Sequence, residues 1–145
     1  MFVVGRGNEP GADIPRPADR VAAGFADDYL LVTLNAVADA PDPAVSGRAE
    51  RVSVWLRSVA GASVPGSYES LSVGERQGAR FPVVVFSYWE DKSFSGAWNR
   101  PYYGRACRIY TVGEHDVTST SLDCPPNVGD HPTSATLSNE GWFAN

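Results

Sequence analysis

The chain contains very little of what most functional sites are built from. Its 145 residues include only two histidines and two cysteines, and Lys92 is the single lysine. The two cysteines do not form a CxxC pair and neither has a histidine at metal-ligand spacing, so we expect no metal site. A phosphate loop, a nucleotide fingerprint and a Gly-x-Ser-x-Gly elbow are also missing from the sequence. These absences leave no motif for a cofactor or for a familiar catalytic class.

The charge balance argues against a nucleic-acid surface. The formal net charge is -5, and no basic run is longer than a pair. The preference for arginine over lysine is typical of a GC-rich coding bias, which is common in actinobacteria. Hydrophobic content of 43% and charged content of 20% are ordinary for a globular protein long enough to bury a core. We expect one folded domain over residues 18–145, preceded by a Gly/Pro-rich flexible linker over residues 1–17.

The two cysteines bear on the cellular compartment. A disulfide between Cys107 and Cys124 in an exported protein is the favoured interpretation, and two buried free thiols are the alternative. The apolar start over residues 1–4 is too short for a signal peptide or a membrane span. The chain is therefore either cytoplasmic or a soluble piece that follows an anchor or leader, and the predicted disulfide favours an extracytoplasmic location.

Helical periodicity dominates the first part of the chain. Pro17 suits the first position of a helix, and the apolar spacing predicts a helix over residues 18–37 with Asp27 and Asp28 facing water. Asp42 and Pro43 are typical of a helix start and predict a second helix over residues 43–60. The expected buried faces are Val21, Phe25, Tyr29, Val32 and Ala36 in the first helix, and Val45, Ala49, Val52, Leu56 and Val59 in the second.

Beyond residue 80 the apolar period changes to two, which predicts strands over residues 81–90, 105–113 and 116–124. Both faces of the first of these strands are apolar, so we expect it to be central in the sheet. A possible short strand precedes it over residues 68–73, and Trp142 and Phe143 form an apolar plug late in the tail. The predicted fold class is α+β, with two N-terminal helices on a curved, cone-like antiparallel sheet. The predicted core includes Phe25, Tyr29, Val52, Leu56, Val84, Phe86 and Ile109.

The last two predicted strands suggest how the cysteines meet. Pairing residues whose numbers sum to 231 places Cys107 opposite Cys124 across the hairpin. Directly opposed residues of a non-hydrogen-bonded pair are close enough for a disulfide.

Four aromatic residues lie in the predicted connection over residues 91–104: Phe94, Trp98, Tyr102 and Tyr103. Large aromatic side chains of this kind are typical anchors of protein interfaces. The alternative is a long loop whose rings fold back onto the core, and solvent exposure distinguishes the two.

Catalysis has only weak candidates. His115 beside Asp116 could act as a general base, but Gly-Glu-His-Asp is also an ordinary polar hairpin turn. Asp123 is the other titratable residue near a strand, and both it and His115 lie at predicted strand ends.

The two-helix stretch resembles the start of domains in the nuclear-transport-factor-two-like superfamily. The residues that carry the resemblance are Phe25-Ala26-x-x-Tyr29-Leu30, a Pro-bearing link, and then Arg48-Ala49-Glu50-Arg51-Val52 and Trp55-Leu56. Over residues 18–60 the pattern is similar to the conjugation proteins of the TcpC type. That resemblance implies an extracytoplasmic protein–protein scaffold of a secretion or conjugation assembly, held to the membrane by an anchor outside this chain.

Two function classes and a third possibility follow. The first is a non-catalytic extracytoplasmic interaction module with a protein partner. The second is a small SnoaL-like or ketosteroid-isomerase-like enzyme, which shares the fold and places an acid/base residue inside the cone. A small secreted inhibitor is the third. A deep pocket with a buried titratable group would favour the enzyme, and an interior filled by side chains would favour the module.

Overall fold

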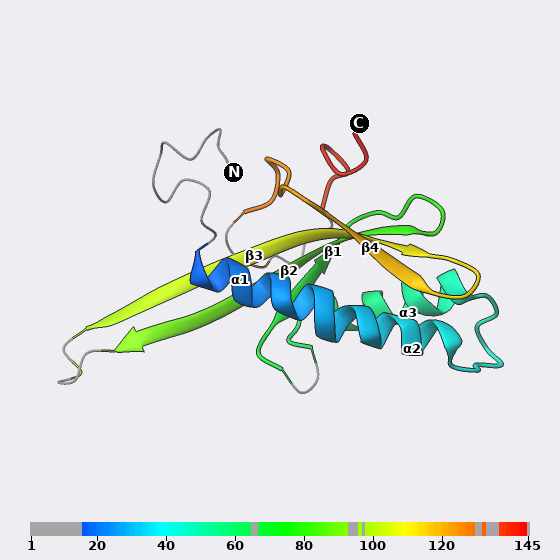
Figure 1. Ribbon diagram of the computed structural model, residues 1–145, viewed down its shortest axis with the longest axis horizontal. Coiled ribbons are helices and arrows are strands. Elements are labelled where there is room, and N and C mark those ends of the chain that lie inside the picture. Colours follow the sequence, from blue (N-terminus) through cyan, green and yellow to red (C-terminus); the bar gives the residue numbers. More distant parts are fainter. Residues whose placement is uncertain are drawn as a thin grey trace, which may run out of the picture.

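The protein is an α+β domain, as predicted from the sequence (Figure 1). The computed structural model describes residues 16–64, 67–92, 96, 98–129, 132 and 137–144. The predicted linker therefore lies almost wholly outside the described residues. The elements in chain order are α1 (Pro17–Gly24), η2 (Phe25–Leu30), α2 (Leu31–Asp39), α3 (Arg48–Val59), β1 (Ser70–Val73), β2 (Arg80–Lys92), β3 (Asn99–Val112) and β4 (Val117–Leu122).

The four strands form one antiparallel sheet in the order β1-β2-β3-β4, so each strand pairs with its neighbour in the chain. The pair β2–β3 is the longest and runs from Arg80 opposite Thr111 to Lys92 opposite Asn99. Helices pack on one face of the sheet, and the C-terminal tail packs on the other (Figure 1). The central position predicted for the strand over residues 81–90 is confirmed, since residues 81–87 are all buried.

The segments α1, η2 and α2 join into one long helix, Pro17–Asp39, which begins at Pro17 as predicted. Its buried stripe recurs at every fourth residue and consists of Ala18, Ala22, Ala26, Leu30, Leu34 and Ala38, each no more than 1% exposed. An α-helix has 3.6 residues per turn, so a stripe of period four drifts by about 40° per step. The wider π turn of η2 takes up part of this drift and keeps the stripe on the sheet.

The sequence prediction chose the wrong face of this helix. Val21, Tyr29 and Val32 are 44%, 45% and 70% exposed, and Phe25 is only partly buried. The prediction placed the larger apolar residues on the buried face. The helix lies so close to the sheet, however, that only alanine fits under its first three turns. Of the predicted core, Tyr29 is therefore wrong, whereas Val52, Leu56, Val84, Phe86 and Ile109 are confirmed as buried.

The closest contact between helix and sheet lies at Gly104. A Cβ atom built there would lie 2.0 Å from the carbonyl carbon of Ala18, so the sheet needs glycine at this position. The Ser87 hydroxyl, on the strand opposite, donates to the Ala18 carbonyl oxygen at 2.7 Å. The backbone N–H of Arg105 donates to Asp19 Oδ1 at 2.9 Å. The first turn of α1 is thereby fixed to β2 and β3 at one point.

Two polar contacts fasten the middle of the helix. Arg108, which is buried, donates through Nε and Nη2 to the two carboxylate oxygens of Asp27 at 2.8 and 3.1 Å. The Tyr110 hydroxyl donates to the Ala26 carbonyl oxygen at 2.7 Å, and burial raises the pKa of this phenol. Asp27 and Asp28 are both exposed, as expected from the sequence, but Asp27 also pairs with the buried Arg108 of the sheet below it.

The second helix begins later than predicted, at Arg48 instead of residue 43. The Asp42 carboxylate accepts the Ala44 N–H at 2.9 Å and forms a local turn, and Gly47 precedes the helix at φ 95°, a conformation that favours glycine. Arg51 of α3 donates to the Ala38 carbonyl oxygen at 3.0 and 2.7 Å and to the Val45 carbonyl oxygen at 3.3 Å. This one guanidinium therefore holds the end of α2 and the connecting loop against α3.

A disulfide joins Cys107 to Cys124, as predicted, with 5.2 Å between the Cα atoms. The predicted register is wrong by two residues, because Cys107 pairs with Leu122 and Cys124 lies beyond the end of β4. A shift of two leaves every side chain on the same face, so the sulfur atoms still meet. The disulfide adjoins a second core cluster, in which Trp142 is 2% exposed and forms the predicted plug.

The Asp27–Arg108 pair gives a first test. Asp27→Asn should lower the free energy of unfolding by about 1–2 kcal/mol, because it leaves a buried guanidinium without its counter-charge while half of the Asp27 side chain is already in water. Asp28→Asn is the matched control, since Asp28 is exposed one residue away. Equal urea midpoints for the two variants would contradict the assignment.

The contact at Gly104 gives a second test. Gly104→Ala should destabilise the fold by about 3 kcal/mol, because the added methyl group collides with the backbone of Ala18. Gly129→Ala is the control, as a Cβ there meets nothing within 4 Å. Urea unfolding of both variants measures the difference in the free energy of unfolding. A Gly104→Ala protein as stable as the unaltered chain would disprove the direct contact between the Ala18 backbone and β3.

Candidate functional site: the aromatic arm

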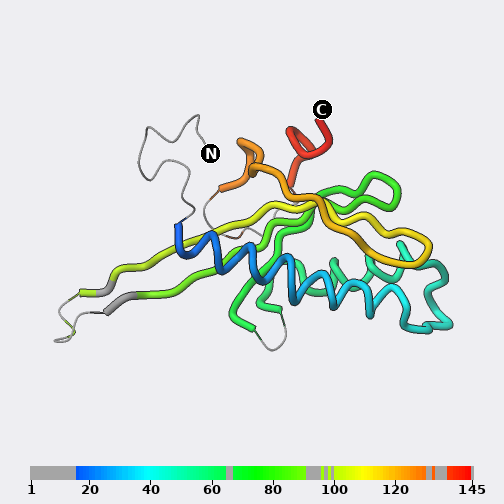
Figure 2. The backbone as a smooth tube through the Cα atoms, viewed as in Figure 1, coloured from blue at the N-terminus to red at the C-terminus, as the bar shows by residue number. Residues whose placement is uncertain are grey.

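The outer part of the β2–β3 hairpin projects from the body of the protein. Figures 1 and 2 show both strands continuing side by side past the start of α1. The sheet is only two strands wide here, since β1 pairs with β2 no further than Phe86 and β4 pairs with β3 only from Cys107. We call residues 88–92 and 98–103 the arm.

The sequence prediction of a long connection over residues 91–104 is wrong for most of that range. β2 extends to Lys92 and β3 begins at Asn99, so most of the expected loop is strand. Pro101 made the segment look like a loop, because proline is disfavoured inside a sheet. It is tolerated here because β3 is an edge strand along the arm, opposite Glu90.

Two cross-strand aromatic pairs occupy opposite faces of the arm. Tyr88 and Tyr103 lie opposite each other with ring centroids 5.0 Å apart, and Trp89 and Tyr102 form the neighbouring pair at 5.5 Å. Aromatic pairs of this kind stabilise an isolated two-stranded ribbon. Tyr88 is 47% exposed, so the pairs support the arm without being withdrawn from solvent.

Polar contacts accompany the rings. The Tyr88 hydroxyl donates to Glu90 Oε2 at 2.7 Å, and this hydrogen bond raises the pKa of Tyr88 to about 12. Towards the end of the arm, the Arg100 guanidinium lies over the Trp98 ring, 5.4 Å from its centroid. Trp98 is 50% exposed, which makes the pair an accessible combination of an apolar surface and a positive charge.

The structure brings the predicted aromatic residues together only in part. Trp98, Tyr102 and Tyr103 belong to the arm, and Phe94 lies outside the described residues. The sequence analysis missed Tyr88 and Trp89 as members of the site. The signal for them was the register of the hairpin, because both pairs have residue numbers that sum to 191.

The two weak catalytic candidates do not converge. His115 is exposed in the turn before β4, and Asp123 is exposed just after β4, so they lie at opposite ends of that strand. In the part of the chain that the structure describes, no cluster of three or more His, Cys, Asp or Glu residues could hold a metal ion.

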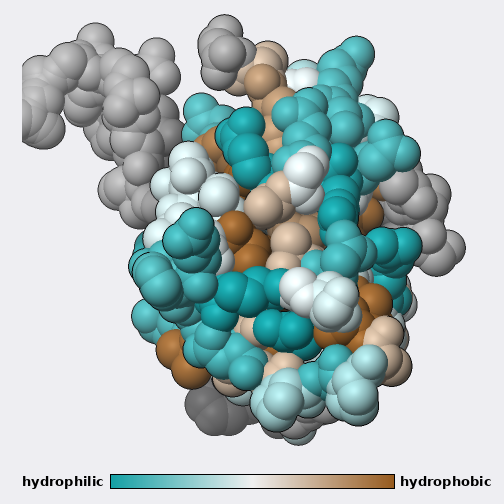
Figure 3. Space-filling model, turned by 90° about the vertical axis from the view of Figure 1, so that its right-hand side faces the viewer, coloured by the Kyte–Doolittle hydropathy of each residue, from teal (hydrophilic) through white to brown (hydrophobic). Residues whose placement is uncertain are grey.

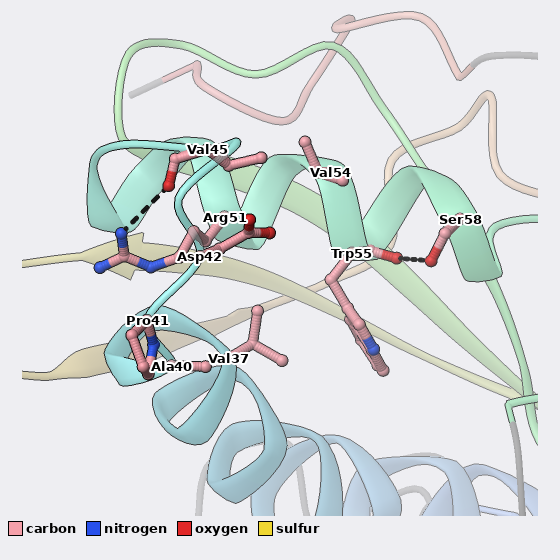
Figure 4. Close-up of a pocket in the computed structure, with 9 residues that line it drawn as sticks. All are labelled: Val37, Ala40, Pro41, Asp42, Val45, Arg51, Val54, Trp55 and Ser58. Carbon is pink, nitrogen blue, oxygen red and sulfur yellow. Dashed lines mark hydrogen bonds between the residues drawn. The ribbon is translucent and has the colours of Figure 1, made fainter.

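A groove lies between α2 and α3, and it is a second feature that the sequence analysis missed. It has a volume of about 310 Å³. Figure 4 shows the Trp55 ring reaching from α3 towards Val37 on α2, with Pro41 in the segment after α2 and Val54 on the upper side of α3. Figure 3 views this end of the molecule and shows hydrophobic side chains gathered between hydrophilic ones.

Comparison of the chain with protein-family models, with curated proteins and with solved structures found no match.

Proposed function

We propose that the protein is a non-catalytic, extracytoplasmic protein–protein interaction module that binds its partner through the aromatic arm. The observation that carries the proposal is a two-stranded ribbon that projects from the body and presents Trp98 half exposed beside Arg100. Tryptophan, tyrosine and arginine are the residues that most often dominate binding energy at protein interfaces. Pairing across the ribbon orders these side chains before binding, which lowers the entropy cost of association.

The charge of the chain favours a protein partner over a nucleic acid. The net charge of -5, in a sequence with no basic run longer than a pair, argues against a surface for phosphate binding. The positive charge of Arg100 lies over an aromatic ring, an arrangement that suits a mixed apolar and acidic surface.

The disulfide supports the extracytoplasmic location, because such bonds persist in oxidising compartments. The helix Pro17–Asp39 is long and apolar enough to cross a membrane by length and composition, but its alanine and leucine stripe packs on the sheet. Helices followed by an antiparallel sheet are compatible with a cone-like domain of the nuclear-transport-factor-two-like kind. The resemblance to TcpC-type proteins favours a place in a membrane-anchored secretion or conjugation assembly.

The enzyme alternative has no observation in its favour. It needs a titratable side chain inside the space between helices and sheet. Among the described residues, that space is filled by a hydrophobic cluster that includes Phe81 and Tyr110, and the Tyr110 hydroxyl donates to the Ala26 carbonyl oxygen. The buried polar or charged side chains of the described chain are Ser53, Ser72, Ser87 and Arg108, and Arg108 is paired with Asp27.

The role of the arm can be tested by crosslinking. A photoreactive phenylalanine analogue at position 98 should give a discrete adduct with one protein in producing cells, and the same analogue at Tyr68, which is 92% exposed, should not. With that partner purified, Trp98→Ala should weaken binding by about 1–3 kcal/mol, or roughly fivefold to 150-fold, with little change in melting temperature. Equal crosslinking from both positions, or unchanged affinity for Trp98→Ala, would overturn the proposal.

The disulfide gives a separate prediction for the exported protein. Its two cysteines are 17 positions apart, so the bond should add about 3 kcal/mol to the free energy of unfolding by restricting the unfolded chain. Unfolding in urea with and without a reductant measures this difference. Denatured, unreduced protein isolated from the native compartment should show no titratable thiol, and two free thiols would contradict an oxidising location.

A further inference from the structure

The arm and the α2–α3 groove lie at opposite ends of the longest axis of the molecule (Figure 1). We propose that the groove of one copy receives the arm of a second copy, with Trp98 in the groove and Arg100 facing Asp42. This inference rests on the proposed function of the arm as a binding surface, and it names the partner as the same chain.

The walls of the groove suit a large apolar side chain. Val37 and Pro41 come from the α2 end, and Val54 and Trp55 come from α3 (Figure 4). Val54 is 51% exposed although it lines a hollow, so covering it would remove apolar surface from water. A volume of about 310 Å³ is at the lower end of the range for small-molecule sites, which fits one aromatic side chain better than a larger ligand.

Hydrogen bonds and an ion pair within the chain fix the shape of the groove. The Arg51 guanidinium spans its base and donates to the Ala38 and Val45 carbonyl oxygens, which fixes the loop between the helices. Arg48 supports the same region by donating to the Gly113 carbonyl oxygen at 2.8 Å and by pairing with Asp39. A second copy would therefore meet a preformed site.

Charge complementarity selects the occupant. The groove lining has two charged residues, Asp42 and Arg51. The Arg51 guanidinium is bonded to the Ala38 and Val45 carbonyl oxygens, whereas Asp42 is exposed and places negative charge beside the apolar hollow. The arm carries the matching combination, since Arg100 is stacked over Trp98. The arm thus supplies both the Trp98 ring, which would fill the hollow, and the Arg100 guanidinium, which would lie beside Asp42 at its edge.

The placement of the two surfaces determines the form of assembly. An arm that docks into a different surface on the next copy makes a head-to-tail contact, which extends into an open chain unless a rotation closes it. One aromatic anchor and one ion pair make a small interface, so we expect a dissociation constant of about 10–100 µM.

A mixing experiment with the full chain tests the inference. Trp98→Ala removes the aromatic ring that would enter the groove and leaves the groove intact. Val54→Asp blocks the groove and leaves the arm intact. Each variant alone should sediment as a monomer at concentrations where the unaltered chain associates. Their mixture should form a 1:1 dimer that does not grow further, because only one productive contact remains.

Matched controls address general surface effects. Tyr68→Ala removes an exposed aromatic residue away from the arm, and Val32→Asp places the same new charge on an exposed valine outside the groove lining. Both control variants should associate like the unaltered chain. Melting temperatures of all four variants show whether each one is folded.

A charge exchange tests the proposed ion pair directly. Arg100→Glu should weaken self-association at least tenfold, and adding Asp42→Lys in the same chain should restore most of it. A chain that stays monomeric at millimolar concentration, a mixture that gives no dimer, or a charge exchange without recovery would overturn self-assembly. Crosslinking from position 98 to a different protein would then still support the arm as a binding surface, so the two failures are distinguishable.

Discussion

The packing of the long helix against the sheet at Gly104 is the contact on which the rest of the structure depends. With no side chain at Gly104, the Ala18 backbone lies directly on β3 and accepts a hydrogen bond from Ser87 on β2. This fixes the start of the helix at the base of the arm, while Asp27 and Asn35 fix it further along through Arg108 and through the backbone of Val117. The arm therefore leaves the body where the start of the helix is fixed to both of its strands.

How far the sequence predicted the fold depends on which interactions are local. The strands and the disulfide could be predicted because alternation and two cysteines are visible in the sequence itself. The buried face of the helix could not, because hydrophobicity ranks Val21 and Tyr29 above Ala18 and Ala22, whereas the real constraint is the distance to the sheet. The helix start at Arg48 was missed because Asp42 forms a turn with Ala44 that imitates a helix cap.

The sequence predicted which aromatic residues belong to the candidate site, but not that they lie on two paired strands. Trp98, Tyr102 and Tyr103 were predicted as interface residues, but the strand pairing that places Tyr102 opposite Trp89 and Tyr103 opposite Tyr88 depends on the register of the hairpin. The groove could not be predicted at all, because it exists only where Arg51 ties α2 to α3 through backbone carbonyl groups. Side-chain type thus pointed to the surface, and tertiary contacts determined its shape.

The most direct measurement of the central claim is the set of indole N–H signals in a nitrogen-labelled chain, which contains four tryptophans. Over a concentration series, the account predicts that the Trp98 and Trp55 signals shift together and approach saturation. The signal of Trp142, which is 2% exposed, should stay constant and serves as the internal reference. A Trp98 signal that does not move, either with concentration or on adding the protein crosslinked through position 98, would contradict the account.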